Sequence, residues 1–283
     1  MTDNIIISDP QKLASIIETM ASQGADKLHI LSDFDRTLTS CFKDGQKAPV
    51  MIQTLKEAGA LTAEYHIKAQ ALFDYYHPIE IDPNISRDEL RQKMEEWYRK
   101  HFALLVQSGL SRDDVIKASR SDRVALRSGV DTFLDLLKGN NIPLIIFSGS
   151  GLGGESIELL LRERQRYFSN IHLVANTIIW DEAGKMKGVK EPIIHVANKD
   201  ETLIHNFPCY SEIKDRKNII LLGDGLGDVD MTRGFDYDNL IKVGFLNENI
   251  ETNLSAYQAA FDVLILNDGS FDYINDLLTK IIK

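Results

Sequence analysis

The chain has few cysteines: Cys41 and Cys209 are the only two among 283 residues, and neither stands in a CxxC or Cys/His cluster. This excludes a disulfide framework and a cysteine-based zinc site, and it is typical of a protein kept in a reducing compartment. The sequence also lacks an apolar run approaching the roughly 18 residues of a membrane span, and it has no recognisable secretory leader. We therefore expect a cytoplasmic protein without a membrane partner.

Basic residues are in the minority. Lysine and arginine number 32 against 42 aspartates and glutamates, which gives a formal net charge of −10. Such a charge repels nucleic acids and anionic membrane surfaces, so we expect no nucleic-acid partner. If the substrate carries phosphate, a local positive field must bind it: a metal ion, one or two lysines, or the amides at helix starts.

Short apolar runs separated by amphipathic segments dominate much of the sequence. An opening helix is predicted from Pro10 to a stop at Gly24, and residues 176–189 are predicted to form a hairpin. Alternation of buried strands and helices predicts an α/β fold with a Rossmann-like parallel sheet covered on both faces. The predicted strands are residues 28–32, 143–147, 171–174, 218–222, 240–245 and 263–266.

One interval breaks this alternation. Residues 40–127 contain no convincing buried strand, but charged helical sequence in which Leu90, Met94, Trp97, His101 and Leu105 share one face. We interpret the interval as a helical cap inserted into an α/β core formed by residues 1–39 and 128–283. The cap would emerge at the carboxyl edge of the sheet, where α/β proteins bind ligands.

Two carboxylates follow the first predicted strand, in Asp33-Phe34-Asp35-Arg36-Thr37-Leu38-Thr39. A bare DxD more often caps a helix or solvates a turn, but the full DxDxT string after a buried strand favours chemistry. One aspartate could attack phosphorus while the other protonates the leaving oxygen.

A second acidic loop, with Asp224 and Asp228, follows the strand predicted at 218–222 and contains three glycines that permit tight turns. Hard oxygen ligands of this type suit Mg²⁺, which takes few protein carboxylates and completes its shell with water and substrate phosphate. An EF-hand is excluded because its D-x-D-x-D-G spacing and its twelfth-position glutamate are missing. The alternative interpretation of this segment is a solvated, glycine-rich acidic loop without a metal-binding role.

Phosphate-binding candidates come from two further segments. Ser148 and Gly149 follow the strand at 143–147, where a hydroxyl and a backbone amide can hold phosphate oxygens. Gly149, Gly151 and Gly154 also fit a G-x-G-x-x-G dinucleotide fingerprint, but the acidic residue expected near positions 174–176 is absent. Lys199 would be an ordinary surface lysine, were it not that the other motifs need one fixed cation.

In this order the four motifs resemble those of the haloacid-dehalogenase superfamily. Along most of its length the chain further resembles the cytosolic pyrimidine 5′-nucleotidase family, often called cytosolic 5′-nucleotidase III. Besides the two acidic loops, the segments that carry this resemblance are Ile79-Glu80-Ile81-Asp82-Pro83, Glu96-Trp97-Tyr98, Leu104-Leu105-Val106-Gln107, and Ile194-His195-Val196 with Asn198-Lys199.

The resemblance implies a Mg²⁺-dependent phosphomonoester hydrolase that converts a nucleoside 5′-monophosphate to nucleoside and phosphate through an aspartyl-phosphate. A phosphatase of another small metabolite is the alternative on the same fold. The resemblance also implies a role for each motif. Asp33 would be the nucleophile and Asp35 the general acid and base, and the metal would be held by Asp33, the Asp35 carbonyl and Asp224, with Asp228 nearby. The phosphate would be bound by Ser148, Gly149 and Lys199, and the nucleoside pocket would contain Glu80, Trp97 and His101.

Three residues depart from the family pattern. Arg36 stands where an uncharged residue is expected, Ser150 alters the small-residue pattern after Ser148-Gly149, and His101 replaces a small hydroxyl residue. We expect a small-molecule nucleotide substrate and a monomer.

Overall fold

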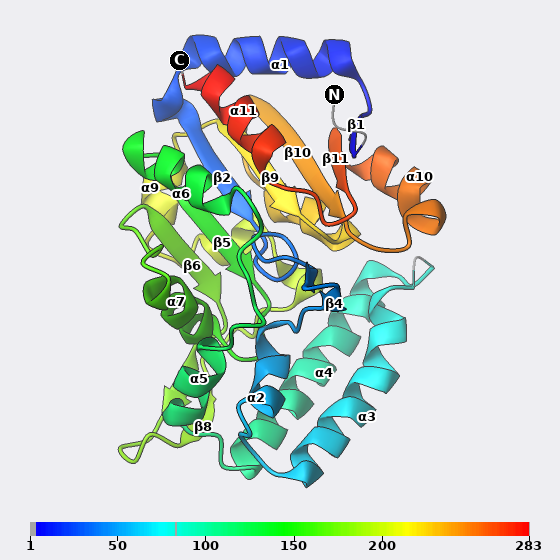
Figure 1. The fold of residues 1–283 in the computed structure, drawn as a ribbon, viewed down its shortest axis with the longest axis vertical. Helices are drawn as coiled ribbons and strands as arrows, with labels where there is room; N and C mark the ends of the chain where they lie inside the picture. Colours follow the sequence, from blue (N-terminus) through cyan, green and yellow to red (C-terminus); the bar gives the residue numbers. More distant parts are fainter. Residues whose placement is uncertain (1–3, 83, 283) are drawn as a thin grey trace.

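The computed structural model describes residues 4–82 and 84–282, so Pro83 of the 79–83 segment lies outside the described residues. A seven-stranded sheet forms its centre (Figure 1). Across the sheet the strands are β1 (Ile5–Ile7), β11 (Val263–Leu266), β10 (Asn239–Leu246), β9 (Asn218–Gly223), β2 (Leu28–Ser32), β5 (Leu144–Ser148) and β6 (Ile171–Ala175). All neighbouring pairs are parallel except β1 with β11. The prediction of a largely parallel α/β sheet is confirmed.

Two layers of helices cover the sheet because successive strand residues point to opposite faces. Leu28 and Ile30 of β2 belong to the core beneath four helices, α1 (Pro10–Gln23), α6 (Val130–Gly139), α7 (Gly154–Glu163) and α11 (Asp272–Ile281). Leu31 belongs to the core on the other face, beneath α8 (Glu201–Ile204), α9 (Tyr210–Ile213) and α10 (Ile250–Ala260).

The opening helix α1 begins and ends as predicted. The Asp9 carboxylate accepts hydrogen bonds from the amides of Gln11 (3.1 Å) and Lys12 (3.0 Å), and Pro10 occupies the first turn. Gly24 ends the helix at a φ of 80°, a conformation that favours glycine. The three-residue strand β1 before this helix was not predicted.

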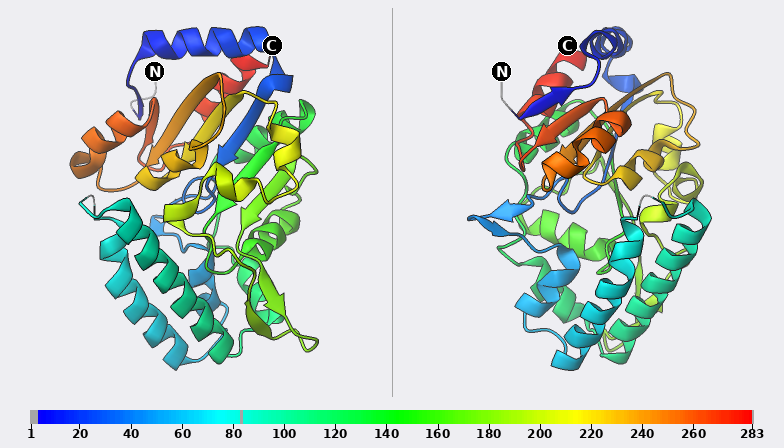
Figure 2. Two further views of the ribbon diagram at one scale, coloured as in Figure 1. Left: turned by 180° about the vertical axis from the view of Figure 1, so that it is seen from behind. Right: turned by 90° about the vertical axis from the view of Figure 1, so that its right-hand side faces the viewer.

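The segment between β2 and α6 is mainly helical, as expected, and lies beyond the carboxyl ends of the parallel strands (Figures 1 and 2). Its long helices α3 (Ala63–Glu80) and α4 (Arg87–Gln107) pack side by side, and the shorter α2 (Thr54–Glu57) and α5 (Arg112–Ser119) complete it. Two short strands that were not predicted, β3 (Phe42–Lys43) and β4 (Gln46–Lys47), form a small hairpin before α2. The division into a core and a cap at residues 40 and 127 stays a prediction.

The predicted hairpin at 176–189 is present as β7 (Ile178–Trp180) and β8 (Met186–Val189). It packs against the inserted helices: the Met186 amide donates a hydrogen bond to the Leu110 carbonyl at 2.9 Å, and Ser111 bridges to Lys185. Ile178 and Met186 share an apolar cluster with Leu105 and Leu110. The apolar core of the insert therefore includes side chains from the second half of the chain.

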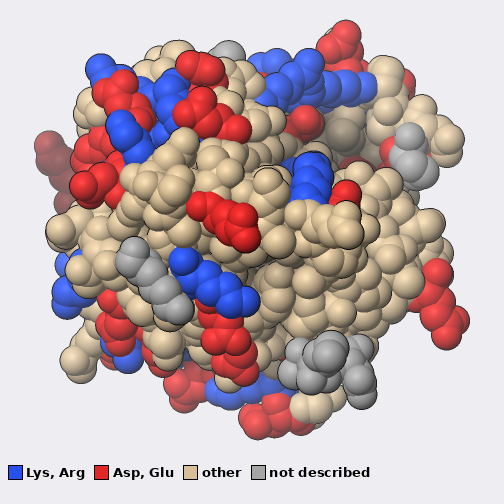
Figure 3. Space-filling view, turned by 90° about the horizontal axis from the view of Figure 1, so that it is seen from above, with Lys and Arg blue, Asp and Glu red and all other residues tan. Residues whose placement is uncertain are grey.

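Within the described part of the chain, no helix is long and apolar enough to cross a membrane. The face of the molecule on which α1 lies carries basic and acidic side chains in small neighbouring groups, without an extended basic area (Figure 3). This face therefore offers no continuous positive surface to a polyanion.

Candidate active site

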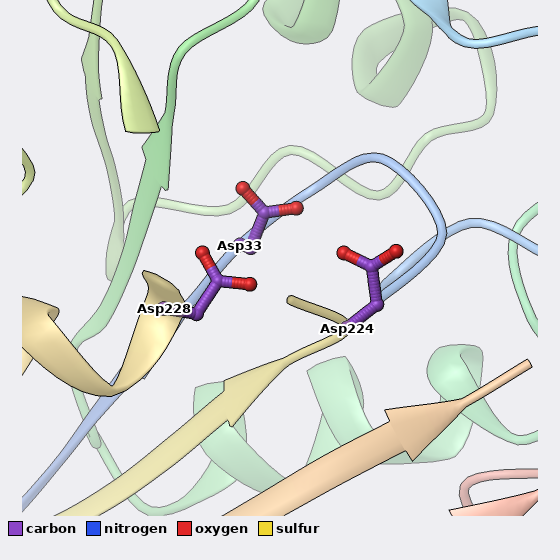
Figure 4. A group of neighbouring side chains, drawn as sticks. All are labelled: Asp33, Asp224 and Asp228. Atoms are coloured by element: carbon purple, nitrogen blue, oxygen red, sulfur yellow. The ribbon is translucent and has the colours of Figure 1, made fainter. Parts of the chain in front are cut away.

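Three aspartates meet where neighbouring strands end. Asp33 follows β2, and its amide donates a hydrogen bond to the Leu222 carbonyl of β9 at 3.0 Å. Asp224 follows β9, and Asp228 lies in the 3₁₀ segment η4 (Leu226–Thr232). One carboxylate oxygen from each lies within 4.8 Å of the other two, and the side chains point into a common space (Figure 4).

The β9 loop depends on a glycine for this convergence. A Cβ at Gly223 would lie 2.5 Å from the Cβ of Asp228, so any side chain there would push Asp228 out of the site. The Asp228 Oδ2 atom also accepts a hydrogen bond from the Gly225 amide at 3.0 Å, which fixes its orientation.

Lys199 brings the one ammonium group that the described residues place directly on these carboxylates. Its buried Nζ donates to Asp33 Oδ1 and, at 3.3 Å, to Asp228 Oδ1. The loop that holds it is internally bonded: Asn198 accepts from the His195 amide at 2.8 Å and donates to the Ile193 carbonyl at 2.7 Å. Lys199, expected from the sequence to supply one fixed cation for the phosphate, thus lies beside Asp33 and Asp228, and its contact with phosphate stays a prediction.

Burial shifts the pKa values of the charged groups in this site. Desolvation raises the pKa of Asp33 to about 7, opposed by the nearby Lys199 ammonium and reinforced by Asp228. Desolvation and repulsion from Asp33 and Asp228 also raise the pKa of Asp224 well above its ordinary value. For Lys199, burial alone would lower the pKa, but the two aspartates together hold it above its ordinary range. Negative charge therefore exceeds the positive charge available.

Asp35 lies beside this cluster on the loop after β2. Its Oδ1 accepts a hydrogen bond from the Met51 amide at 3.0 Å. Burial raises the pKa of Asp35 to about 6, although the Met51 hydrogen bond and the Arg36 charge oppose the shift. A carboxyl with this pKa can both give and take a proton near neutral pH. Arg36, which stands where an uncharged residue was expected, adopts a positive φ of 62°.

Ser148 is the last residue of β5 and Gly149 follows it, at the same edge of the sheet. The Ser148 Oγ accepts a hydrogen bond from the Ser150 amide at 3.1 Å. A Cβ at Gly149 would lie 3.1 Å from the hydroxyl oxygen of Tyr98, which reaches the site from α4. Burial raises the pKa of Tyr98, and the charges of Glu80, Lys199 and Asp33 also act on it. Tyr98 was not predicted as a site residue, although Glu96-Trp97-Tyr98 carries the family resemblance.

The three expected nucleoside-pocket residues have different surroundings. Glu80 accepts a hydrogen bond from His77 Nδ1 at 2.9 Å, and Trp97 stacks on Tyr76 with ring centroids 5.7 Å apart. His101 Nε2 lies 3.1 Å from the Gly151 carbonyl oxygen, and burial lowers its pKa to about 4, so the neutral ring donates this hydrogen bond. His101 thus ties α4 to the loop after β5, and its contact with substrate stays a prediction.

The chemistry of the cluster fits a divalent cation. Asp33, Asp224 and Asp228 offer hard oxygen donors, the kind that Mg²⁺ prefers, and no softer ligand joins the group found among the described residues. A bound dication would relieve the repulsion that raises the pKa of Asp224.

A parallel sheet with a DxD pair after a central strand, an acidic loop after its neighbour and a buried lysine between them is the arrangement of a haloacid-dehalogenase-type phosphatase. Solved structures agree on the fold. The crystal structure of cytosolic 5′-nucleotidase IIIB bound to cytidine matches with a TM-score of 0.88 at 29% identity, covering 99% of this chain and 94% of that one. A substrate-bound phosphoserine phosphatase matches with a TM-score of 0.53 at 18% identity, covering 88% of this chain and 96% of that one.

The chain belongs to the pyrimidine 5′-nucleotidase (UMPH-1) family, whose model matches residues 36–282. Similar proteins include the 7-methylguanosine phosphate-specific 5′-nucleotidases of Mus musculus, 32% identical with 100% of this chain and 94% of the relative covered, and of Xenopus laevis (form A), 33% identical with 98% and 95% covered. It is therefore a 5′-nucleotidase, a phosphoric monoester hydrolase. The dinucleotide alternative loses its support, and the Gly154 amide already donates to the Asn176 carbonyl at 2.8 Å.

Proposed function

We propose that this enzyme hydrolyses a nucleoside 5′-monophosphate through an aspartyl-phosphate formed on Asp33. The carrying observation is the Asp33 carboxylate, buried at the carboxyl edge of the sheet, paired with Lys199 and facing Asp224 and Asp228. Such a group can attack phosphorus in line while positive charge holds the phosphate oxygens.

The other residues divide the remaining work. Asp35 gives a proton to the departing 5′ oxygen of the nucleoside and then, as a carboxylate, takes one from the water that hydrolyses the aspartyl-phosphate. Ser148, the Gly149 amide and Lys199 hold the phosphate oxygens. Asp33, Asp224, Asp228 and the Asp35 carbonyl would hold Mg²⁺, which supplies neutralisation of the phosphate charge.

Two observations support a nucleotide as substrate. The relatives named above are specific for 7-methylguanosine phosphate, and the solved nucleotidase holds cytidine. In this chain, Glu80, Trp97 and the half-exposed Phe73 of α3 and α4 offer a carboxylate acceptor and aromatic faces for a base. We further propose a cytoplasmic monomer.

The test is phosphate release from a panel of nucleoside 5′-monophosphates, with sugar phosphates and phosphoserine included. We expect nucleotides to be turned over fastest, activity to vanish after metal stripping in EDTA and return with Mg²⁺, and calcium to support little turnover. Asp33→Asn should abolish turnover, whereas Asp236→Asn, whose side chain is 91% exposed, should leave it unchanged. Near-normal turnover by Asp33→Asn would refute the mechanism, and preference for a sugar phosphate would refute the substrate.

A further inference from the structure

Arg127 lies where the chain returns from the insert to the sheet. The outgoing and returning segments pair there: the Ser40 amide donates to the Ala125 carbonyl, and the Arg127 amide to the Leu38 carbonyl, both at 2.9 Å. The Arg127 side chain is only 1% exposed, so its charge is buried beside the loop that carries Asp33 and Asp35. A buried guanidinium is costly unless its donors are paired.

Its donors are used on the backbone that directly follows Asp35. Nε donates to the Thr37 carbonyl at 2.9 Å, and Nη2 donates to the carbonyls of Arg36 and, at 3.4 Å, Thr39. Only the planar, five-donor guanidinium can reach several carbonyls of one turn at once, so lysine is not an equivalent replacement.

These contacts stabilise an unusual backbone conformation. Arg36 has a φ of 62°, in the left-handed region that a side chain other than glycine rarely adopts. Its carbonyl accepts from Arg127 and also from Asn247 Nδ2 at 3.1 Å. Because Arg36 shares a peptide bond with Asp35, loss of these donors would let the Asp35 main chain turn.

The opposite side of the guanidinium is anchored to the rigid sheet. Nη1 donates to Asp268 Oδ1 at 2.7 Å, after β11, and the guanidinium stacks 4.2 Å from the ring centroid of Phe245 in β10. The Asp268 carboxylate also accepts from the amides of Cys41 (2.8 Å) and Phe42 (2.9 Å). One ion pair thus fixes both connections to the insert and the turn after Asp35.

We propose that Arg127 is a positioning residue, which aims the Asp35 carboxyl at the leaving oxygen by holding the Arg36–Thr39 turn. The proposal rests on the proposed role of Asp35 as general acid. It predicts that loss of Arg127 impairs hydrolysis of a substrate whose poor leaving group needs a proton much more than hydrolysis of a substrate with a good leaving group.

The experiment compares kcat/KM for a nucleoside monophosphate, whose leaving alcohol needs a proton, with kcat/KM for 4-nitrophenyl phosphate, whose leaving group does not. Asp35→Asn gives the reference pattern, with a loss on the nucleotide of about 10²-fold or more. Arg127→Lys should lower the nucleotide value at least ~10-fold and the nitrophenyl value less than ~3-fold. Arg164→Lys is the matched control, since Arg164 donates to the Val124 carbonyl of the same returning segment.

Equal losses on both substrates, or no loss on either, would overturn the positioning role. If Arg127→Lys does not fold, Asn247→Ala leaves Arg127 in place but removes the second donor to the Arg36 carbonyl and the Oδ1 atom that accepts from Arg127 Nη2 at 3.1 Å. This variant should show the same split at smaller size, and no split there overturns the proposal. A wild-type enzyme inactive on nucleotides, or an Asp35→Asn variant without the split, would instead show that the proposed function is wrong.

Discussion

At the scale of single residues, the active site holds charges that oppose folding. Asp224 is half-buried, and its pKa is raised by desolvation and by repulsion from Asp33 and Asp228. A folded-state pKa above the unfolded value means that the ionised form at neutral pH is less stable in the folded protein than in the unfolded chain. If Asp224 binds the metal as proposed, stability at this residue is traded for function.

This leads to a prediction for Asp224→Asn. Without metal at pH 7, the variant should melt at least ~2 °C above the wild type, because the amide keeps the volume and removes the repelled charge. With Mg²⁺ the order should reverse, since ligand binding to the folded state stabilises only the protein that can bind it. Thermal melts in EDTA and in Mg²⁺ test this, with Asp236→Asn as the control. An unchanged or lowered melting temperature in EDTA would contradict the electrostatic argument.

His29 in β2 gives an independent acid-linked prediction. It is 1% exposed, its Nδ1 lies 2.9 Å from the Arg216 carbonyl, and burial lowers its pKa to about 4. Between pH 6.5 and 4 the unfolded chain binds a proton at this residue and the folded protein does not, so stability falls on acidification. From pH 7 to pH 5 the loss should be about 2 kcal/mol.

His29→Gln should remove this part of the acid sensitivity. Urea unfolding of both proteins at pH 7 and pH 5, in EDTA, isolates the histidine because the carboxylates contribute equally to each. Identical acid losses in the two proteins would show that His29 is not responsible.

Candidate site residues can be proposed from the sequence where a polar side chain stands at the carboxyl end of a buried strand. Asp33 and Asp224 directly follow β2 and β9, and Ser148 is the last residue of β5, so strand prediction alone places them at one edge of the sheet. Tyr98 was noted only as part of the Glu96-Trp97-Tyr98 segment that carries the family resemblance, and Arg127 carries no local signal. Arg127 bonds Thr37 and Asp268 across separations of 90 and 141 residues, contacts that only the folded chain defines.

At the scale of elements, strands buried on both faces were predicted to within about one residue because parallel strands read as continuous apolar runs. β1 was missed: three isoleucines are too short a run, and their pairing with β11 spans almost the whole chain. The strands of the β3–β4 hairpin are only two residues long and mostly exposed, but Asp44-Gly45 between them, with φ of 52° and 73°, is a type I′ turn signal that could have revealed it.

Helix α4 carries the prediction on substrate selectivity. Trp97 is half-exposed and stacks on Tyr76, and Glu80 stands at the end of the neighbouring α3. Glu80→Gln and Trp97→Phe should raise KM for nucleotides at least ~10-fold with little change for 4-nitrophenyl phosphate, which lacks a base to contact the cap. Parallel losses on both substrates, or a lower melting temperature without a KM effect, would place these residues in the structural core of the cap.

At the scale of the whole molecule, the sheet and the insert are connected by more than the covalent chain. Arg87 of α4 lies 3.3 Å from Asp230, next to the acidic loop, and Arg99 pairs with Glu191 at 2.7 Å. Exposed pairs of this type contribute at most about 1 kcal/mol each. The association is instead held mainly by apolar packing, in which the β7–β8 hairpin and Ile193 take part.

Because the β7–β8 hairpin completes the apolar core of the insert, the insert cannot simply be exchanged by itself between related enzymes. Transplanting residues 40–127 alone into a related sheet would leave Leu105 and Leu110 without Ile178 and Met186, and the donor sheet would expose those two side chains to water. A functional exchange of caps, by an engineer or by gene rearrangement, must move two separate stretches of the chain together. We therefore expect the exchangeable unit to be discontinuous in the sequence, and point substitutions to change substrate preference more readily than the exchange of one segment.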